Sequence, residues 1–300
     1  MSELKGKTPY GELDELEVIV MCEDSVQYES PFLGQHGISL LARGISAGIS
    51  RSILMDVGQN PDALLENFNV MNIDPAEIDS IVLTHCHYDH TQGLTEILKA
   101  IGKKDLPVIA HPSIFRLNFI TSPYLRNVGV MMGDSKENLR EAGGELFLTA
   151  DPLQLMSGLF TTGEIKRVTD FEEVGISLST IDEGHVKPDA MMDDISITAC
   201  VKGKAPVILT GCSHAGIVNI VTQVSRMCGG GKRDFECVMG GFHLVEAPDE
   251  RIKKTTEALK KFSIKSIYAG HCTGFRAQAS LYSAFGPAFS PLQTGMTFKF

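Results

Sequence analysis

The sequence predicts an α/β protein in which two mixed β-sheets pack face to face, with helices on the outside. Each half of the chain holds a β-rich stretch that ends in alternating strands and helices. Hydrophobic residues make up 43% of the 300 residues, which is enough for one large core. No linker of biased composition separates the halves, so we expect a single domain over residues 1–300.

In the first half we expect strands at residues 17–22, 37–42, 51–56, 81–83 and 108–110. A glycine-rich turn at 44–48 separates two of them. Asn60-Pro61 predicts a helix start, because proline suits the first helical position, and Asp74-Pro75 repeats the pattern. A second apolar stripe predicts a helix after Gly93.

Residues 111–144 lack strand alternation and contain Pro112, Pro123 and Gly133. We interpret them as a mostly helical or loop excursion over the mouth of a site, and an ordinary surface loop is the alternative.

The second half alternates strands with helices. We expect strands at 146–148, 159–162, 176–181, 195–201, 207–210, 236–239 and 264–268, and helices at 217–227 and 251–262. The last three strands each end in a polar turn with a histidine: His214, His243 and His271. Strands of one sheet that end together place these turns along one edge, where open α/β sheets bind ligands. One such histidine would be an ordinary structural residue, but three predict a site.

Composition excludes several classes of protein. A net charge of −10 disfavours nonspecific binding to nucleic acid. No apolar run approaches the roughly 18 residues of a membrane span. The N-terminal segment is polar and is not typical of a signal peptide, and seven scattered cysteines do not suggest a disulfide framework. We therefore expect a cytoplasmic protein.

The strongest motif is Thr84-His85-Cys86-His87-Tyr88-Asp89-His90, which follows the buried strand at 81–83. In an extended segment alternate side chains share a face, so His85 and His87 can point the same way. The following turn brings Asp89 and His90 beside them. Imidazole and carboxylate ligands suit zinc or iron better than calcium or magnesium. The alternative is mere crowding of polar groups, which would be costly without a metal.

This H-x-H-x-D-H turn resembles the metal motif of the metallo-β-lactamase superfamily. The resemblance implies an αββα sandwich in which His85 and His87 hold one divalent ion, and Asp89 and His90 hold a second. It also implies that His271 completes the second site. For the first site two candidates remain, His185 and His214.

A closer resemblance, which runs over essentially the whole chain, decides between them. It is carried by residues 34–39, 55–59, 193–194, 210–220, 240–244 and 271–274. These motifs resemble the branch named for 7,8-dihydropterin-6-ylmethyl-4-(β-D-ribofuranosyl)aminobenzene-5′-phosphate synthase. Its pattern has a histidine at the position of His214 and requires none at His185, which we therefore expect on the surface.

One position departs from the superfamily. Cys212 stands where an aspartate often bridges the two metals. It is either a thiolate ligand or a small buried residue, and we favour the second. Asp193 or Asp194 could supply a carboxylate ligand instead, or could support the ligands through hydrogen bonds. Asp56 matches an aspartate that supports the metal-site loop. Cys86 and Cys272 are expected to be packing residues.

Other residues are candidates for catalysis or substrate binding. Besides its ligand role, Asp89 is a catalytic candidate, and His243 could act as a general acid or anion contact. His36 is either substrate-binding or structural, and His111 is structural or pocket-lining. The helix start at Ser213 and the turn at Gly241 suit a phosphate. Phe242 and Met131-Met132 offer surface for a flat ring.

We therefore expect an enzyme with two divalent ions, zinc most of all, with iron or manganese as alternatives. Its substrate is a phosphorylated small molecule, and neither nucleic acid nor membrane is a partner; a homo-oligomer is compatible with the sequence. In the reaction that the branch implies, an arylamine displaces diphosphate from a pterin methylene carbon. The alternatives are metal-dependent hydrolysis of a phosphoester, ester or lactone, and a non-catalytic ligand sensor.

Overall fold

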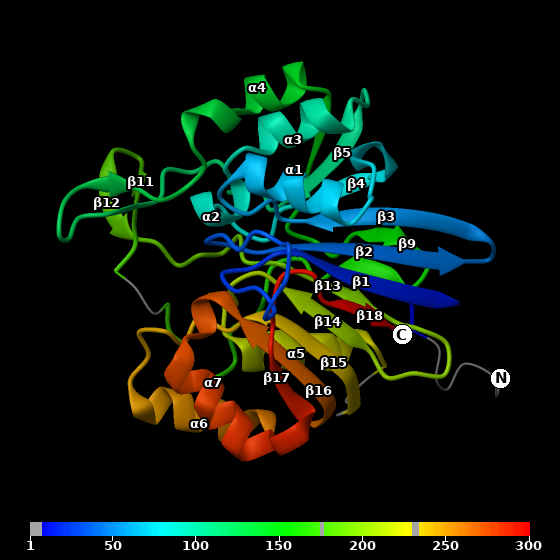
Figure 1. The fold of residues 1–300 in the computed structure, drawn as a ribbon. Coiled ribbons are helices and arrows are strands. Elements are labelled where there is room, and N and C mark those ends of the chain that lie inside the picture. The colour runs from blue at the N-terminus through cyan, green and yellow to red at the C-terminus, as the bar shows by residue number, and fades with distance from the viewer. Residues whose placement is uncertain (1–7, 175–176, 230–233) are drawn as a thin grey trace.

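The computed structural model describes residues 8–174, 177–229 and 234–300, and its core is a pair of seven-stranded sheets (Figure 1). The first sheet has the order β18-β1-β2-β3-β4-β5-β8 and the second β17-β16-β15-β14-β13-β10-β9. A small third sheet has the order β12-β11-β6-β7. The expected αββα architecture is confirmed.

The first sheet is built from β1 (Glu15–Cys22), β2 (Ser39–Ser46), β3 (Ile49–Met55), β4 (Ser80–Val82), β5 (Leu106–Ala110), β8 (Gly144–Leu148) and β18 (Thr297–Lys299). The helices on its outer face are α1 (Pro61–Val70), α3 (Leu94–Ile101) and α4 (Lys136–Glu141). The Asn60 side chain caps α1, as the sequence predicts, but Asp74-Pro75 begins only the 3₁₀ turn η1 (Pro75–Glu77). Strand β2 continues through Gly44, so the predicted turn at 44–48 shrinks to Ala47 and Gly48.

The second sheet comprises β9 (Gln154–Met156), β10 (Leu159–Thr161), β13 (Ser196–Ala199), β14 (Val207–Thr210), β15 (Asp234–Gly241), β16 (Ser263–Gly270) and β17 (Phe289–Pro291). Helices α5 (Ile217–Met227), α6 (Asp249–Leu259) and α7 (Phe275–Phe285) cover its outer face. The strands β14, β15 and β16 are adjacent and parallel, so their carboxyl ends share one edge, as predicted.

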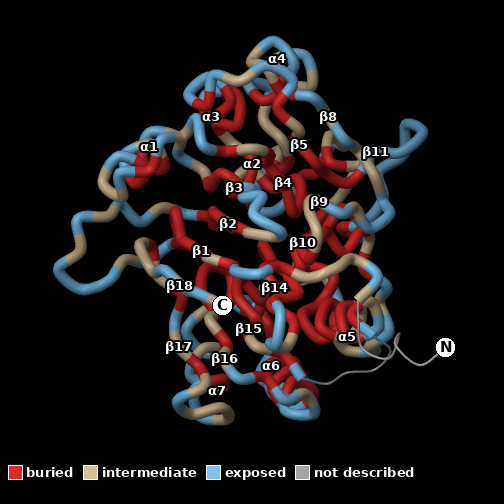
Figure 2. The backbone as a smooth tube through the Cα atoms, turned by 90° about the vertical axis from the view of Figure 1, so that its right-hand side faces the viewer, coloured by how far each residue is buried: buried red, intermediate tan, exposed pale blue. Residues whose placement is uncertain are grey.

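Alternation along the strands divides the apolar residues among three layers. Val18 and Val20 of β1 enter the core between the two sheets, where they meet Leu209 and Met239 of the second sheet. Their neighbour Ile19 faces the outer helices instead. Figure 2 shows the result, with buried chain inside the sandwich and exposed chain at its periphery. The two sheets are thereby held face to face, which fixes their edges relative to each other.

The excursion at 111–144 consists mostly of loop and helix, as predicted, but it also contains two short strands that were not predicted. Strands β6 (Phe119–Ile120) and β7 (Arg126–Asn127) form a hairpin, followed by η2 (Met132–Asp134) and α4. The hairpin extends a second one made of β11 (Ser179–Asp182) and β12 (His185–Pro188). Its strands are too short for alternation to reveal them in the sequence. The predicted start of β11 at residue 176 lies outside the described residues.

No helix in the described parts of the chain is long and apolar enough to cross a membrane.

Candidate metal centre

The candidate centre lies where the carboxyl ends of strands from both sheets meet. The H-x-H-x-D-H turn follows β4, and its last residues form the short helix α2 (Tyr88–Thr91). From the facing sheet come His214 after β14 and His271 after β16. The sandwich therefore brings together residues that are nearly 200 positions apart in the sequence.

Three histidines form the first group. His85 Nε2 and His214 Nε2 each lie 3.2 Å from His87 Nδ1, and all three side chains are buried. Burial lowers the pKa of each, that of His87 to about 4, so all three are neutral at pH 7. Tetrahedral zinc holds its nitrogen ligands about 3.3 Å apart, given bonds of roughly 2.0–2.1 Å. Neutral, converging imidazoles at this spacing fit a metal ion.

A second group lies beside the first and contains Asp89, His90, Cys212 and His271, whose ligand atoms are all within 4.8 Å of one another. The Asp89 carboxylate is 3.1 Å from His271 Nε2 and 3.6 Å from His90 Nε2. Burial raises the pKa of Asp89, but the neighbouring histidines outweigh this and hold it well below its ordinary value. A charged carboxylate among imidazoles fits a second divalent ion.

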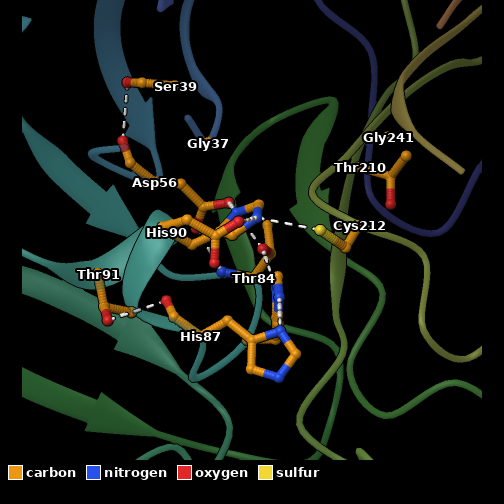
Figure 3. Close-up of polar contacts among 12 residues, drawn as sticks. Gly37, Ser39, Asp56, Thr84, His87, His90, Thr91, Thr210, Cys212 and Gly241 are labelled. Carbon is orange, nitrogen blue, oxygen red and sulfur yellow. Dashed lines mark hydrogen bonds and ion pairs between the residues drawn. The ribbon is translucent and has the colours of Figure 1, made fainter. Parts of the chain in front are cut away.

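Cys212 occupies a shared position between the groups. Its sulfur lies 3.1 Å from His90 Nε2 (Figure 3). It is also within 4.8 Å of the nearest ring nitrogens of His85 and His214. The sequence favours a small buried residue without a ligand role at this position. Cys212 is indeed buried, but the structure aims its sulfur into both groups. Sequence could not show this, because it depends on how the two sheets are packed.

Hydrogen bonds from residues outside the two groups orient the ligand candidates. Asp56, which follows β3, accepts from His90 Nδ1 at 2.7 Å and from the amide and hydroxyl of Thr84 (Figure 3). This is the supporting position predicted for it. His271 Nδ1 is held by Asp24, at 2.8 Å, and its amide donates to Glu23. No motif in the sequence predicts this acidic pair, although Glu23 and Asp24 directly follow a buried strand, as Asp56 does.

Asp193 and Asp194 support the centre without joining either group. Asp193 accepts from the Cys86 amide at 2.8 Å and pairs with Arg116 at 2.8 Å. Asp194 accepts from the Ala215 amide at 2.6 Å, and burial raises its pKa to about 7. Both carboxylates therefore hold the loops that carry ligand histidines rather than contributing to the metal groups.

Residues with a strained backbone lie at the sheet edges that form the candidate centre. Asp56, Ser213, His243 and His271 have positive φ angles of 56°, 62°, 42° and 48°. Residues other than glycine rarely adopt this conformation, and it is concentrated at functional sites. Each of the four follows a strand that ends at the centre.

A cavity of about 530 Å³ opens onto the centre. Its floor includes His87, Asp89, Cys212 and His271. The remaining lining residues are His36, Tyr88, Ile120, Thr121, Ser122, Arg126, Val128, Ser177, His243, Val245, Glu246 and Cys272. The second group and part of the first are therefore accessible to a small molecule.

His36 and His243 both line this cavity, as candidates for catalysis or substrate binding should. His36 lies 3.4 Å from Asp24 and 3.5 Å from Asp89, and the hydrogen bond with Asp24 raises its pKa. The His243 ring packs on that of His214 with centroids 4.0 Å apart. Cys272, expected to be only a packing residue, lines the cavity too, whereas Cys86 is fully buried in the core.

Several expected substrate contacts lie elsewhere. Ser213 is buried and donates to the Gly241 carbonyl at 2.7 Å, and neither residue lines the cavity. Phe242 is buried in the core and Met132 is exposed away from the cavity lining. His185 is exposed on β12, as expected, and His111 bonds to Ser113 and Glu164 as a structural residue.

The prediction of a phosphate-binding site at the start of α5 is wrong, because amides that would bind the phosphate already donate to carboxylates of the protein. The amides of Val218 and Asn219 already donate to the buried Glu172 carboxylate, at 2.8 and 2.9 Å. Asp194 takes the Ala215 amide. The Glu172 carboxylate thus neutralises the positive end of this helix. Because Glu172 is distant from α5 in the sequence, no local pattern predicts this contact.

Comparisons with known proteins agree with this geometry. The β-lactamase superfamily domain matches residues 51–159, which include the H-x-H-x-D-H turn. A solved metal-dependent hydrolase of the β-lactamase superfamily aligns with a TM-score of 0.77 at 22% identity, covering 94% of this chain and 98% of that one. A diphosphatase of the PhnP family aligns with a TM-score of 0.54 at 13% identity, covering 96% and 98%.

A curated relative is more similar in sequence. The 7,8-dihydropterin-6-methyl-4-(β-D-ribofuranosyl)-aminobenzene-5′-phosphate synthase of Methanocaldococcus jannaschii is 39% identical over 293 residues, which cover 97% of this chain and 98% of the relative. The chain is therefore an enzyme of the metallo-β-lactamase superfamily, in the family of the archaeal synthase that it matches over nearly its whole length.

Proposed function

We propose that this enzyme joins an arylamine riboside phosphate to a dihydropterin methyl diphosphate, with release of diphosphate. The observation that carries the proposal is the full-length similarity to the synthase, together with a two-group ligand centre at the floor of a cavity. In this reaction the bond from the methylene carbon to a diphosphate oxygen breaks. The carbon bonds to the amine nitrogen, which releases one proton.

The ligand set supports two divalent ions, and zinc is the metal that we propose. Imidazole nitrogens and a cysteine sulfur suit zinc, and the carboxylate of Asp89 is compatible with it. When bound, the ions supply positive charge for the oxygens of the leaving diphosphate. His85, His87 and His214 would hold one ion and Asp89, His90 and His271 the other, with Cys212 shared.

The protein residues contribute orientation. Asp56 and Asp24 fix the ring positions of His90 and His271 through hydrogen bonds of 2.7 and 2.8 Å. Ile120, Val128 and Val245 give the cavity apolar surface on which a flat ring can lie. We propose that a ring lying on these residues places the methylene carbon near the centre, where the amine can reach it.

The test is amine-dependent release of diphosphate. Zinc-loaded protein is mixed with dihydropterin-6-methyl diphosphate, with and without 4-(β-D-ribofuranosyl)aminobenzene 5′-phosphate, and diphosphate and the coupled product are measured. We expect both products only when the amine is present. Equal release without the amine would indicate a hydrolase and overturn the proposal. His214→Ala should abolish turnover, whereas His185→Ala, which alters an exposed histidine, should retain it.

A further inference from the structure

The small sheet β12-β11-β6-β7 stands beside the metal centre as an arm, and β11 and β12 visibly project from the sandwich (Figure 1). The hairpin β6–β7 pairs Ile120 with Arg126 across its strands. Both residues, with Thr121, Ser122 and Val128, line the cavity. The arm therefore forms one wall of the cavity. This wall contains apolar and hydroxyl side chains and one arginine, whereas the floor consists of the metal-ligand candidates.

Arg126 brings a positively charged side chain to the cavity lining. It is the one lysine or arginine among the described residues that line the cavity, and the acidic residues there are Asp89 and Glu246. Within the described residues it forms no salt bridge with a carboxylate. Its guanidinium is left available to a ligand.

The Arg126 guanidinium lies over the ring of Tyr88. The Arg126 Cζ atom lies 5.7 Å from the centroid of the Tyr88 ring, a cation–π contact. Tyr88 is half-buried and stands between the ligand candidates His87 and Asp89. The contact thus anchors the arm to the metal-binding turn and holds the cation above the same cavity.

The cavity consequently has two places that suit an anion. One is the metal centre at the floor, and the other is Arg126 at the wall. The start of α5 is not a third, because Glu172 and Asp194 occupy its amides. A guanidinium presents paired N–H donors that match a phosphate group.

We infer that Arg126 binds a terminal phosphomonoester of the substrate, remote from the carbon at which the bond forms. The inference rests on the proposed function. The product of the synthase relative carries a 5′-phosphate on a ribose, separated by the aminobenzene ring from its pterin. With the leaving diphosphate at the metal floor, the 5′-phosphate of the arylamine partner lies at Arg126 and its ring against Ile120 and Val128.

The test compares two ligands that differ by one phosphate. Titration calorimetry on zinc-loaded protein measures Kd for 4-(β-D-ribofuranosyl)aminobenzene 5′-phosphate and for the same riboside without phosphate. We expect the wild type to prefer the phosphate, and Arg126→Ala to reduce that preference about 10- to 100-fold, as expected for lost charge-assisted hydrogen bonds. Arg126→Lys should retain part of it, because a single ammonium replaces the paired donors.

Lys136→Ala is the matched control. Its ammonium also lies over an aromatic ring, 5.1 Å from the centroid of Phe115, but neither residue lines the cavity. We expect it to leave the phosphate preference unchanged. A preference that is absent in the wild type, unchanged in Arg126→Ala or equally reduced in Lys136→Ala would overturn the inference.

Inorganic diphosphate separates this inference from the proposed function. It should bind wild type and Arg126→Ala alike, because it binds at the metal floor. If the wild type catalyses amine-dependent diphosphate release but Arg126→Ala keeps its phosphate preference, only the assignment of Arg126 fails. If no amine-dependent release occurs, the proposed function fails, whatever the role of Arg126.

Discussion

The sulfur of Cys212 lies 3.1 Å from His90 Nε2 and is close to both groups of candidate metal ligands. A single side chain after β14 thereby joins the half of the centre made by three histidines to the half that contains Asp89. Thiolate sulfur suits zinc and iron, so a cysteine at this position narrows the choice of metal. The neighbouring His90 is fixed in turn by Asp56.

Cys212→Ser should weaken metal binding at both groups, because serine replaces the shared sulfur by a poorer ligand. We expect a loss larger than the roughly 10- to 100-fold that removal of a supporting hydrogen bond costs. Competition with a chromophoric chelator measures it. Cys212→Asp should restore much of the affinity, and Cys237→Ala, which alters a buried cysteine in β15, should bind metal normally. Normal binding by Cys212→Ser would show that the sulfur is not a ligand.

His214→Ala should lose one metal ion per chain, because it removes one of three converging imidazoles. His185→Ala should keep full metal content, since His185 is exposed on β12. Elemental analysis after reconstitution with zinc distinguishes them. The reverse pattern would assign the ligand role to His185.

Asp56→Asn should reduce metal affinity by about 10- to 100-fold, because the neutral amide replaces the carboxylate that accepts the hydrogen bond from His90 Nδ1 and orients its ring. The chelator competition used for Cys212 measures the change. Asp62→Asn, at an exposed position in the first turn of α1, is the control and should have no effect. Equal affinities for Asp56→Asn and the wild type would exclude a supporting role.

Asp189 should contribute pH-dependent stability. Burial raises the pKa of its carboxyl, but hydrogen bonds from Arg116, of 2.6 and 3.0 Å, and the positive charge outweigh this and lower it. A carboxyl with a lowered pKa stabilises the fold above its unfolded pKa of about 3.9 and loses that contribution as pH falls through the folded value. Asp189→Asn should therefore lower the free energy of unfolding by about 2 kcal/mol at pH 7.

The difference between Asp189→Asn and the wild type should begin to shrink near pH 4, where the carboxyl of the unfolded chain takes up a proton, and should continue to shrink until the pH falls below the lowered pKa of the folded state. Urea denaturation at pH 7 and at lower pH measures it. Asp182→Asn removes the partner of Lys187 in an exposed pair and should cost less than about 1 kcal/mol. A difference for Asp189→Asn that is constant across this range would exclude the linkage.

The sequence by itself determined the elements that depend on local patterns. The strand Val207–Thr210 and the helix Ile217–Met227 match their predicted bounds, because apolar periodicity and flanking glycines specify them. The H-x-H-x-D-H turn was identifiable because four ligand types in seven residues follow a buried strand. Short strands such as β6 and β7 could not be identified from the sequence, because a strand of two residues is too short to show alternation of apolar and polar side chains.

Tertiary structure alone decided which side chains support the predicted ligand candidates from outside their own turns. Asp24 reaches His271 from 247 positions away, and Cys212 aims its sulfur at His90 from 122 positions away. Glu172 takes the amides at the start of α5, which cancels a phosphate site that the local sequence suggests. These contacts depend on the packing of one sheet against the other and on loops that fold back over the edge. A pattern read along one strand or helix contains no information about such distances, because the chain specifies them through the whole core.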